Sequence, residues 1–92
     1  MSKPIEVKLK LVNRWGLHAR TSVSLAKTAN RRSSDIMIEH NGASANAKDC
    51  GALMLLIAGK GDELRITTAG KDEVAAMDEI VNLINNKFGE SA

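Results

Sequence analysis

Apolar and charged residues alternate at the start of the chain. In the segment IEVKLKLV, residues 5–12, the period is two and one face is charged, which predicts a half-buried β-strand. The same alternation recurs at residues 35–40 and 62–68. Asn41-Gly42 is a strong hairpin signal after the second of these segments. Residues 43–48, although rich in alanine, are therefore expected to return as a strand.

Three other segments carry helical signals. In residues 19–30 and 74–88, apolar side chains recur every three or four positions, which predicts amphipathic helices with one apolar face. The acidic residues 72–73 precede the last helix and suit its positive end. Residues 49–58 form a short apolar stretch opened by Asp49, a favourable N-cap residue, and are expected to form a short helix.

The resulting order is β-α-β-β-α-β-α. Strands with one polar face and helices with one apolar face suit two packed layers. We therefore predict an α+β fold, an open-faced β-sandwich in which a four-stranded antiparallel sheet carries three helices on one face. No linker or internal repeat interrupts the pattern, so one domain over residues 1–92 is expected.

Composition narrows the class of protein. Apolar residues make up 43% of the chain and charged residues 26%, as in ordinary folded domains. A net charge of +2, with Trp15 and Phe88 as the only aromatic residues, gives no indication of nucleic-acid binding. Cys50 is the only cysteine, which excludes an internal disulfide and fits a reducing compartment. No signal peptide or membrane-spanning stretch is visible, so a cytoplasmic location without membrane contact is expected.

The segment NRWGLHART, residues 13–21, carries the most distinctive chemistry. His18 follows a glycine turn and falls at the predicted start of the first helix. A helix N-terminus presents free backbone N–H groups and binds anions. Arg20 adds a guanidinium whose planar fork fits phosphate oxygens. These residues suit a histidine that accepts a phosphoryl group and later releases it.

Other roles for His18 stay open at this point. The imidazole could simply cap the helix. A metal site fits less well, because two histidines and one cysteine lack the spacing of a ligand set. A Ser-His-Asp hydrolase also fits poorly, since no G-x-S-x-G turn is present near Ser22 or Ser24.

Four motifs resemble those of one protein family. They are GLHAR at residues 16–20, NAKD at 46–49 before an apolar helix, AGKG at 58–61 and GKDE at 70–73. In this order and spacing they are similar to the motifs of the HPr family, the histidine-containing phosphocarriers of the bacterial phosphoenolpyruvate:sugar phosphotransferase system. The resemblance extends from about residue 5 to residue 88.

The resemblance implies a function and its residues. His18 would accept a phosphoryl group on Nδ1 from phosphoenolpyruvate-charged enzyme I and pass it to an enzyme IIA domain, for sugar uptake or regulation. Arg20 would stabilise the phosphohistidine, and the backbone of Ala19 and Arg20 would contact the phosphate. Such a protein is a phosphoryl-relay carrier rather than a free-standing enzyme, is expected to be a monomer, and needs no cofactor or metal of its own.

The resemblance also implies a surface that docks both partners. Gly51 stands where the family often has a bulky apolar residue, which would thin this surface. The residues expected to contact partners are Trp15, Thr21, Cys50, Leu53 and Met54.

Asp49 occupies the position of the family's regulatory serine. The carboxylate either caps the second helix or partly imitates a phosphoserine, although it carries about one charge against 1.5 to 2 for phosphate. Two alternative functions therefore remain. One is a regulatory paralogue in a nitrogen-type or other signalling relay, with a transcriptional or kinase regulator as partner. The other is an interaction domain that is never phosphorylated. His40 is expected to be a solvent-facing hairpin residue.

Overall fold

The computed structural model describes residues 3–92, so Met1 and Ser2 of the predicted domain lie outside the described residues. Its elements follow the predicted order, with a short 3₁₀ helix added at the end. They are β1 (Ile5–Lys10), α1 (Ala19–Asn30), β2 (Asp35–His40), β3 (Ala43–Asn46), α2 (Cys50–Met54), β4 (Glu63–Ala69), α3 (Glu73–Asn85) and η1 (Lys87–Gly89).

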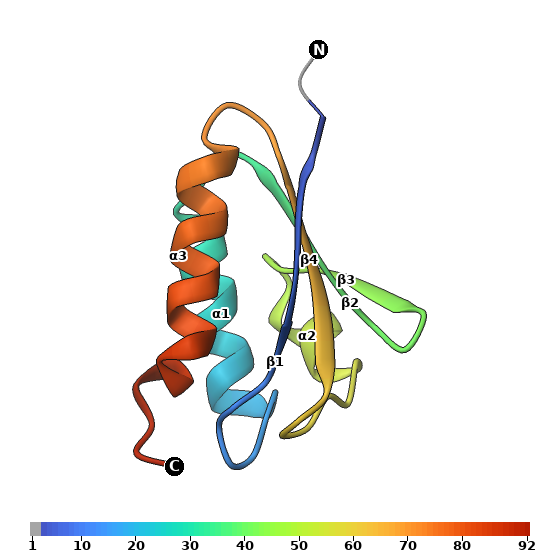
Figure 1. The fold of residues 1–92 in the computed structure, drawn as a ribbon, viewed down its shortest axis with the longest axis vertical. Helices are drawn as coiled ribbons and strands as arrows, with labels where there is room; N and C mark the ends of the chain where they lie inside the picture. Colours follow the sequence, from blue (N-terminus) through green and yellow to red (C-terminus); the bar gives the residue numbers. More distant parts are fainter. Residues whose placement is uncertain (1–2) are drawn as a thin grey trace.

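The four strands form one antiparallel sheet in the order β1-β4-β2-β3. Ile5 of β1 pairs with Thr68 of β4, and Lys10 pairs with Glu63 at the other end of the same two strands. Figure 1 shows α1 and α3 side by side along one face of this sheet. The α+β open-faced sandwich predicted from the sequence is confirmed.

The periodicities of the sequence explain this layering. In β2 and β4 every second side chain is buried beneath the helices, and the side chains between them face away from the core. Burial of these aliphatic side chains is the main favourable contribution to folding. The largest fully buried apolar side chains are Leu11, Leu25, Ile36, Ile38, Leu53, Leu64, Ile66, Ile80 and Ile84.

The second helix is shorter than expected. The apolar stretch 49–58 predicts helix throughout, but α2 ends at Met54. Ile57 has a φ of +51°, a left-handed conformation that a helix cannot include and that β-branched residues rarely adopt. Leu55 and Ile57 are consequently turned outward, and 80% and 81% of their respective surfaces are exposed. Within residues 3–92, no helix combines the length and hydrophobicity needed to cross a membrane.

Asp72 joins the start of α3 to the segment before β2. Its carboxylate accepts hydrogen bonds from the Ser33 and Ser34 backbone N–H groups, at 3.1 and 2.9 Å, and from the Ser34 hydroxyl. The Ser34 hydroxyl, followed by the two N–H groups, lowers the pKa of Asp72 from 3.8 to about 2. The ionised carboxylate is therefore part of the folded structure.

This contact predicts an acid-dependent loss of stability. Because the pKa of Asp72 is lower in the folded chain, its contribution is complete above about pH 4 and is lost as the pH falls from 3.8 towards 2. Asp72→Asn should lower the urea midpoint at neutral pH. It should also reduce the further fall of this midpoint between pH 3.8 and 2. The same change at Asp35, exposed in β2, is the control and should leave the decline in place. An unaltered decline in Asp72→Asn would contradict the assignment.

Candidate functional site

His18 is the N-cap residue of α1. Its backbone is extended, with φ of −114° and ψ of −173°, and its ring Nδ1 accepts a hydrogen bond from the Arg20 backbone N–H at 3.3 Å. In return, the His18 N–H donates to the Thr21 hydroxyl at 3.0 Å. This reciprocal capping box fixes the imidazole against the N-terminus of α1, where free N–H groups and the helix dipole favour an anion.

The turn before His18 depends on close packing against another turn. Gly16 has a φ of +63°, and a Cβ placed on it would lie 2.4 Å from the Ala58 carbonyl oxygen and 2.7 Å from Gly59 Cα. The next residue, Leu17, donates its N–H to the Ala58 carbonyl at 2.9 Å. Only glycine can adopt this positive φ and also leave room for Ala58 and Gly59. The packing of Gly16 against residues 58–59 therefore positions His18 at the start of α1.

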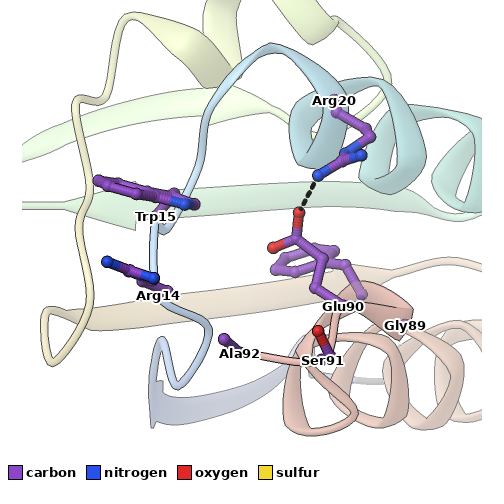
Figure 2. A pocket seen from close by; sticks show the side chains of 8 residues that line it. Arg14, Trp15, Arg20, Gly89, Glu90, Ser91 and Ala92 are labelled. Atoms are coloured by element: carbon purple, nitrogen blue, oxygen red, sulfur yellow. Dashed lines mark hydrogen bonds and ion pairs between the residues drawn. The ribbon is translucent and has the colours of Figure 1, made fainter.

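A carboxylate from the C-terminal end of the chain completes the site. Glu90 Oε2 lies 3.2 Å from His18 Nε2 and 2.9 Å from Arg20 Nη2. Its other oxygen accepts from the buried Asn13 side-chain amide at 3.1 Å. Figure 2 shows the Arg20 and Glu90 side chains pointing toward each other. Hydrogen bonds from Asn13, and then from Arg20 and His18, lower the pKa of Glu90, which favours its ionised form.

Sequence reasoning missed Glu90 and the role of Asn13. Glu90 lies 72 residues after His18, and it reaches the site because the chain turns back at η1. Phe88 and Gly89 have φ values of +55° and +80° in this turn. From the sequence alone, Asn13 is expected only to be part of a turn. No local signal in the sequence indicates that these side chains meet.

The contacts of the His18 ring assign its proton. A carboxylate only accepts hydrogen bonds and a backbone N–H only donates them. Nε2 therefore carries the proton towards Glu90, and Nδ1 presents its lone pair to the Arg20 N–H. Nδ1 is thus the ring nitrogen that carries the lone pair, and it lies at the N-terminus of α1, where an added anion would be stabilised.

Of the residues expected to dock partners, some are exposed in the structure and others are buried. Trp15 is 66% exposed, with the Arg14 guanidinium 4.9 Å from its ring centroid, and Met54 is 40% exposed. Cys50 is half-buried. The expectation is wrong for Thr21 and Leu53, whose side chains are buried. Thr21 turns inward to donate to the Gly16 carbonyl at 2.8 Å, and Leu53 belongs to the core.

Two further expectations concern Asp49 and His40. Asp49 caps α2 as expected, because its side chain accepts from the Ala52 N–H at 3.1 Å. The expectation that His40 faces solvent is wrong, since only 10% of its side chain is exposed and both ring nitrogens have partners. Across residues 3–92, no group of three or more His, Cys, Asp or Glu side chains is arranged to hold a metal ion.

Comparison with known proteins connects this site to a family. Residues 5–86 match the family model described as PTS HPr component phosphorylation site. The chain is 36% identical over 86 residues to phosphocarrier protein HPr of Neisseria meningitidis, covering 94% of this chain and 97% of that protein. It is 38% identical over 87 residues to HPr-like protein Crh of Halalkalibacterium halodurans, covering 95% and 99%.

A solved structure agrees with this assignment. HPr-C-His from Thermoanaerobacter tengcongensis superposes with a TM-score of 0.91 at 35% identity, covering 96% of this chain and 99% of that one. The match includes the segment that carries His18. The chain therefore belongs to the HPr family of phosphocarrier proteins of the phosphotransferase system.

Proposed function

We propose that this chain accepts a phosphoryl group on Nδ1 of His18 from phosphoenolpyruvate-charged enzyme I and passes it to an enzyme IIA domain. The observation that carries the proposal is the fixed orientation of the ring, with Nε2 held by Glu90 and Nδ1 facing the N-terminus of α1. We further propose one domain over residues 1–92 that acts as a monomer in the cytoplasm, in sugar uptake or its regulation.

The residues around the ring suit each stage of transfer. The Nδ1 lone pair gives up its hydrogen bond from the Arg20 N–H and attacks phosphorus, a new N–P bond forms and the bond to the donor breaks. The ring keeps its Nε2 proton, so the product is a phosphoimidazolium whose positive charge faces Glu90. The backbone N–H groups of Ala19 and Arg20 lie in the first turn of α1, where they can bond the phosphate oxygens. The Arg20 side chain is 79% exposed and is free to turn from Glu90 to the phosphate.

We propose that partners dock on an apolar patch beside the site, formed by Trp15, Met54, Leu55 and Ile57. All four side chains are exposed, which is unusual for residues of this size. Ile57 supports this role most strongly, because its backbone is in a strained conformation while its side chain faces solvent. The segments that carry these residues are joined by the hydrogen bond from the Leu17 N–H to the Ala58 carbonyl.

Phosphorylation in vitro tests the proposal. The chain would be incubated with phosphoenolpyruvate, enzyme I and Mg²⁺, and its mass would be measured before and after acid treatment. One acid-labile phosphoryl group that is then transferred to an enzyme IIA domain is the expected result. Failure to accept the group from a cognate enzyme I would favour the alternative of an interaction domain in which His18 is only a helix cap.

A regulatory paralogue is the second candidate function. The observation that favours it is the permanent carboxylate of Asp49 at the start of α2, and the relative named HPr-like protein Crh is consistent with it. Its partner would be a transcriptional or kinase regulator. Asp49→Ser should then be phosphorylated faster by enzyme I than the natural chain. An unchanged rate would leave Asp49 as a helix cap only.

Removal of Glu90 should change the tautomer of His18. In Glu90→Ala the Nε2 proton loses its acceptor, so the neutral ring should shift from predominantly Nε2–H to a mixture of both tautomers. Ring ¹⁵N chemical shifts at alkaline pH measure this change. Glu90→Gln is the matched control, because its side-chain carbonyl still accepts from Nε2 and should preserve the original pattern. Ring shifts that show Nδ1–H as the major tautomer of the natural chain would contradict the proton assignment, whereas identical shifts in Glu90→Ala would show that the Arg20 N–H fixes the tautomer without Glu90.

A further inference from the structure

His40 is a buried histidine outside the phosphoryl-acceptor site. It is the last residue of β2, and its ring bridges two groups of another segment. Nδ1 lies 2.9 Å from the Leu56 carbonyl oxygen and Nε2 lies 3.1 Å from Asp62 Oδ2. Both partners are acceptors, so the arrangement is fully satisfied when both ring nitrogens donate. A buried ring with two such bonds is a strong constraint on the segment it contacts.

The segment that His40 bridges is the turn 56–62, which connects α2 to β4. Leu56 and Asp62 are its two ends, so a single ring ties both of them to β2. Asp62 also closes the turn from within, because Oδ2 accepts from the Gly59 N–H at 2.8 Å and its own N–H donates to the Gly59 carbonyl at 3.0 Å. Leu11 also holds the far end of the turn, because the Gly61 N–H donates to the Leu11 carbonyl at 2.8 Å and the Leu11 N–H donates to the Asp62 carbonyl at 3.0 Å.

The backbone of this turn needs such support. Ile57 lies at φ +51°, and the carbonyl that His40 bonds belongs to the peptide group between Leu56 and Ile57. A β-branched residue in the left-handed region is strained, and such strain persists only where surrounding contacts over-determine it. His40 supplies one of those contacts directly beside the strained residue.

The same turn supports the segment that carries the phosphoryl acceptor. Ala58 accepts the Leu17 N–H at 2.9 Å, and Gly16 packs so closely on residues 58–59 that no Cβ fits between them. Leu17 immediately precedes His18. A displacement of the turn is therefore passed through one hydrogen bond and one close contact to the start of α1.

We propose that His40 is a positioning residue for phosphoryl transfer, which acts with Asp62 to clamp the turn 56–62 and so holds Gly16, Leu17 and the His18 ring in place. This role rests on the proposed phosphocarrier function. It assigns no contact between His40 and the phosphoryl group. Its effect is on the orientation of the His18 ring within the complex and, because Ile57 of the proposed docking patch lies in the same turn, also on docking of the partner.

Three variants of His40 separate the contributions of its two bonds. His40→Phe keeps a ring but removes both donors. His40→Asn places an amide nitrogen near the position of Nδ1 and can keep the bond to Leu56, whereas His40→Gln can keep the bond to Asp62. We expect His40→Phe to lower kcat for phosphorylation by enzyme I about three- to tenfold, because misorientation of a reacting group slows transfer inside the complex. KM should rise as well, because Ile57 of the proposed docking patch lies in the same turn, and His40→Asn should recover most of the lost kcat.

A matched control distinguishes positioning from loss of stability. Thr68 is buried in β4, and its hydroxyl donates to the Glu73 carbonyl at 2.9 Å. Thr68 pairs with Ile5, so it lies at the end of the sheet remote from the turn 56–62. Thr68→Val removes one buried hydrogen bond with little change of shape and should leave kcat unchanged. Hydrogen exchange of the Leu17 N–H should accelerate in His40→Phe but not in Thr68→Val.

Each result decides between these possibilities. A normal kcat in His40→Phe, or an equal loss in Thr68→Val, would overturn the positioning role while leaving the phosphocarrier function intact. A natural chain that accepts no phosphoryl group would refute that function and this role together. If His40→Phe does not fold, Asp62→Leu tests the same clamp with a side chain of similar size that accepts no hydrogen bond from His40 or Gly59, and the same loss of kcat is expected.

Discussion

Replacement of His18 by asparagine is expected to abolish phosphoryl acceptance, lowering the rate by at least about 10⁴-fold, the order found when a covalent nucleophile is removed. The structure holds the imidazole Nδ1, the proposed nucleophile, at the N-terminus of α1. Asparagine is a favourable N-cap residue whose side-chain oxygen can still accept from the Arg20 N–H. The change therefore removes the acceptor and preserves the helix.

Mass spectrometry after incubation with phosphoenolpyruvate and enzyme I measures this loss. His40→Gln is the matched control, because it also removes a histidine but should still take on one phosphoryl group, although more slowly. The urea midpoint of His18→Asn should lie close to that of the natural chain. Acid-labile phosphorylation that persists in a folded His18→Asn chain would move the acceptor to another residue.

Gly16→Ala is expected to have the largest effect on stability, at about 2–6 kcal/mol. The new Cβ would lie 2.4 Å from the Ala58 carbonyl oxygen, a distance that forces one of two backbone segments to move. The positive φ of Gly16 adds the cost of placing an L-residue in the left-handed region. Backbone strain of this kind and overpacking each cost about 1–3 kcal/mol.

Gly42→Ala is the control for this prediction. Gly42 also has a positive φ, of +82°, but a Cβ there would meet no atom within 4 Å. Its substitution should cost only about 1–2 kcal/mol, the conformational term alone. Urea unfolding of both variants gives the two free energies of unfolding. Equal losses would show that the contact between Gly16 and the turn 58–59 contributes nothing.

Local signals in the sequence account for most of the fold. Alternation over a few residues identifies β1, β2 and β4, and three- and four-residue spacing identifies α1 and α3, because each element buries one face against the same core. The position of His18 could also be predicted, since the glycine turn and the helix start lie within a few residues of it.

Features that depend on distant segments could not be predicted. Glu90 reaches His18 through a turn in which Lys87 and Phe88 both have a φ of +55°, a conformation that residues with side chains do not favour. His40 is buried because its two partners belong to a turn that contains Ile57 in a similarly unfavourable conformation. Residues that break local rules leave no local signal, so contacts that depend on them appear only in the folded chain.

Only some of the residues expected to dock partners are exposed, because exposure also depends on contacts with distant segments. The family resemblance marks positions near the site but does not say which way each side chain points. Thr21 is drawn inward by the Gly16 carbonyl, and Leu53 fills the core beneath α2. Leu55 and Ile57 are exposed only because the helix ends early, which the apolar run of residues 49–58 gave no reason to expect.

The return of the chain's last residues to His18 has a practical consequence for handling this protein. The Arg14 N–H donates to the Ala92 carbonyl at 2.9 Å, and Glu90 lies on the imidazole itself. The start of β1 and the C-terminus lie at opposite ends of the molecule (Figure 1). An affinity tag, fluorophore or surface anchor attached after Ala92 would therefore crowd the His18 ring. The same addition before β1 would leave that histidine accessible.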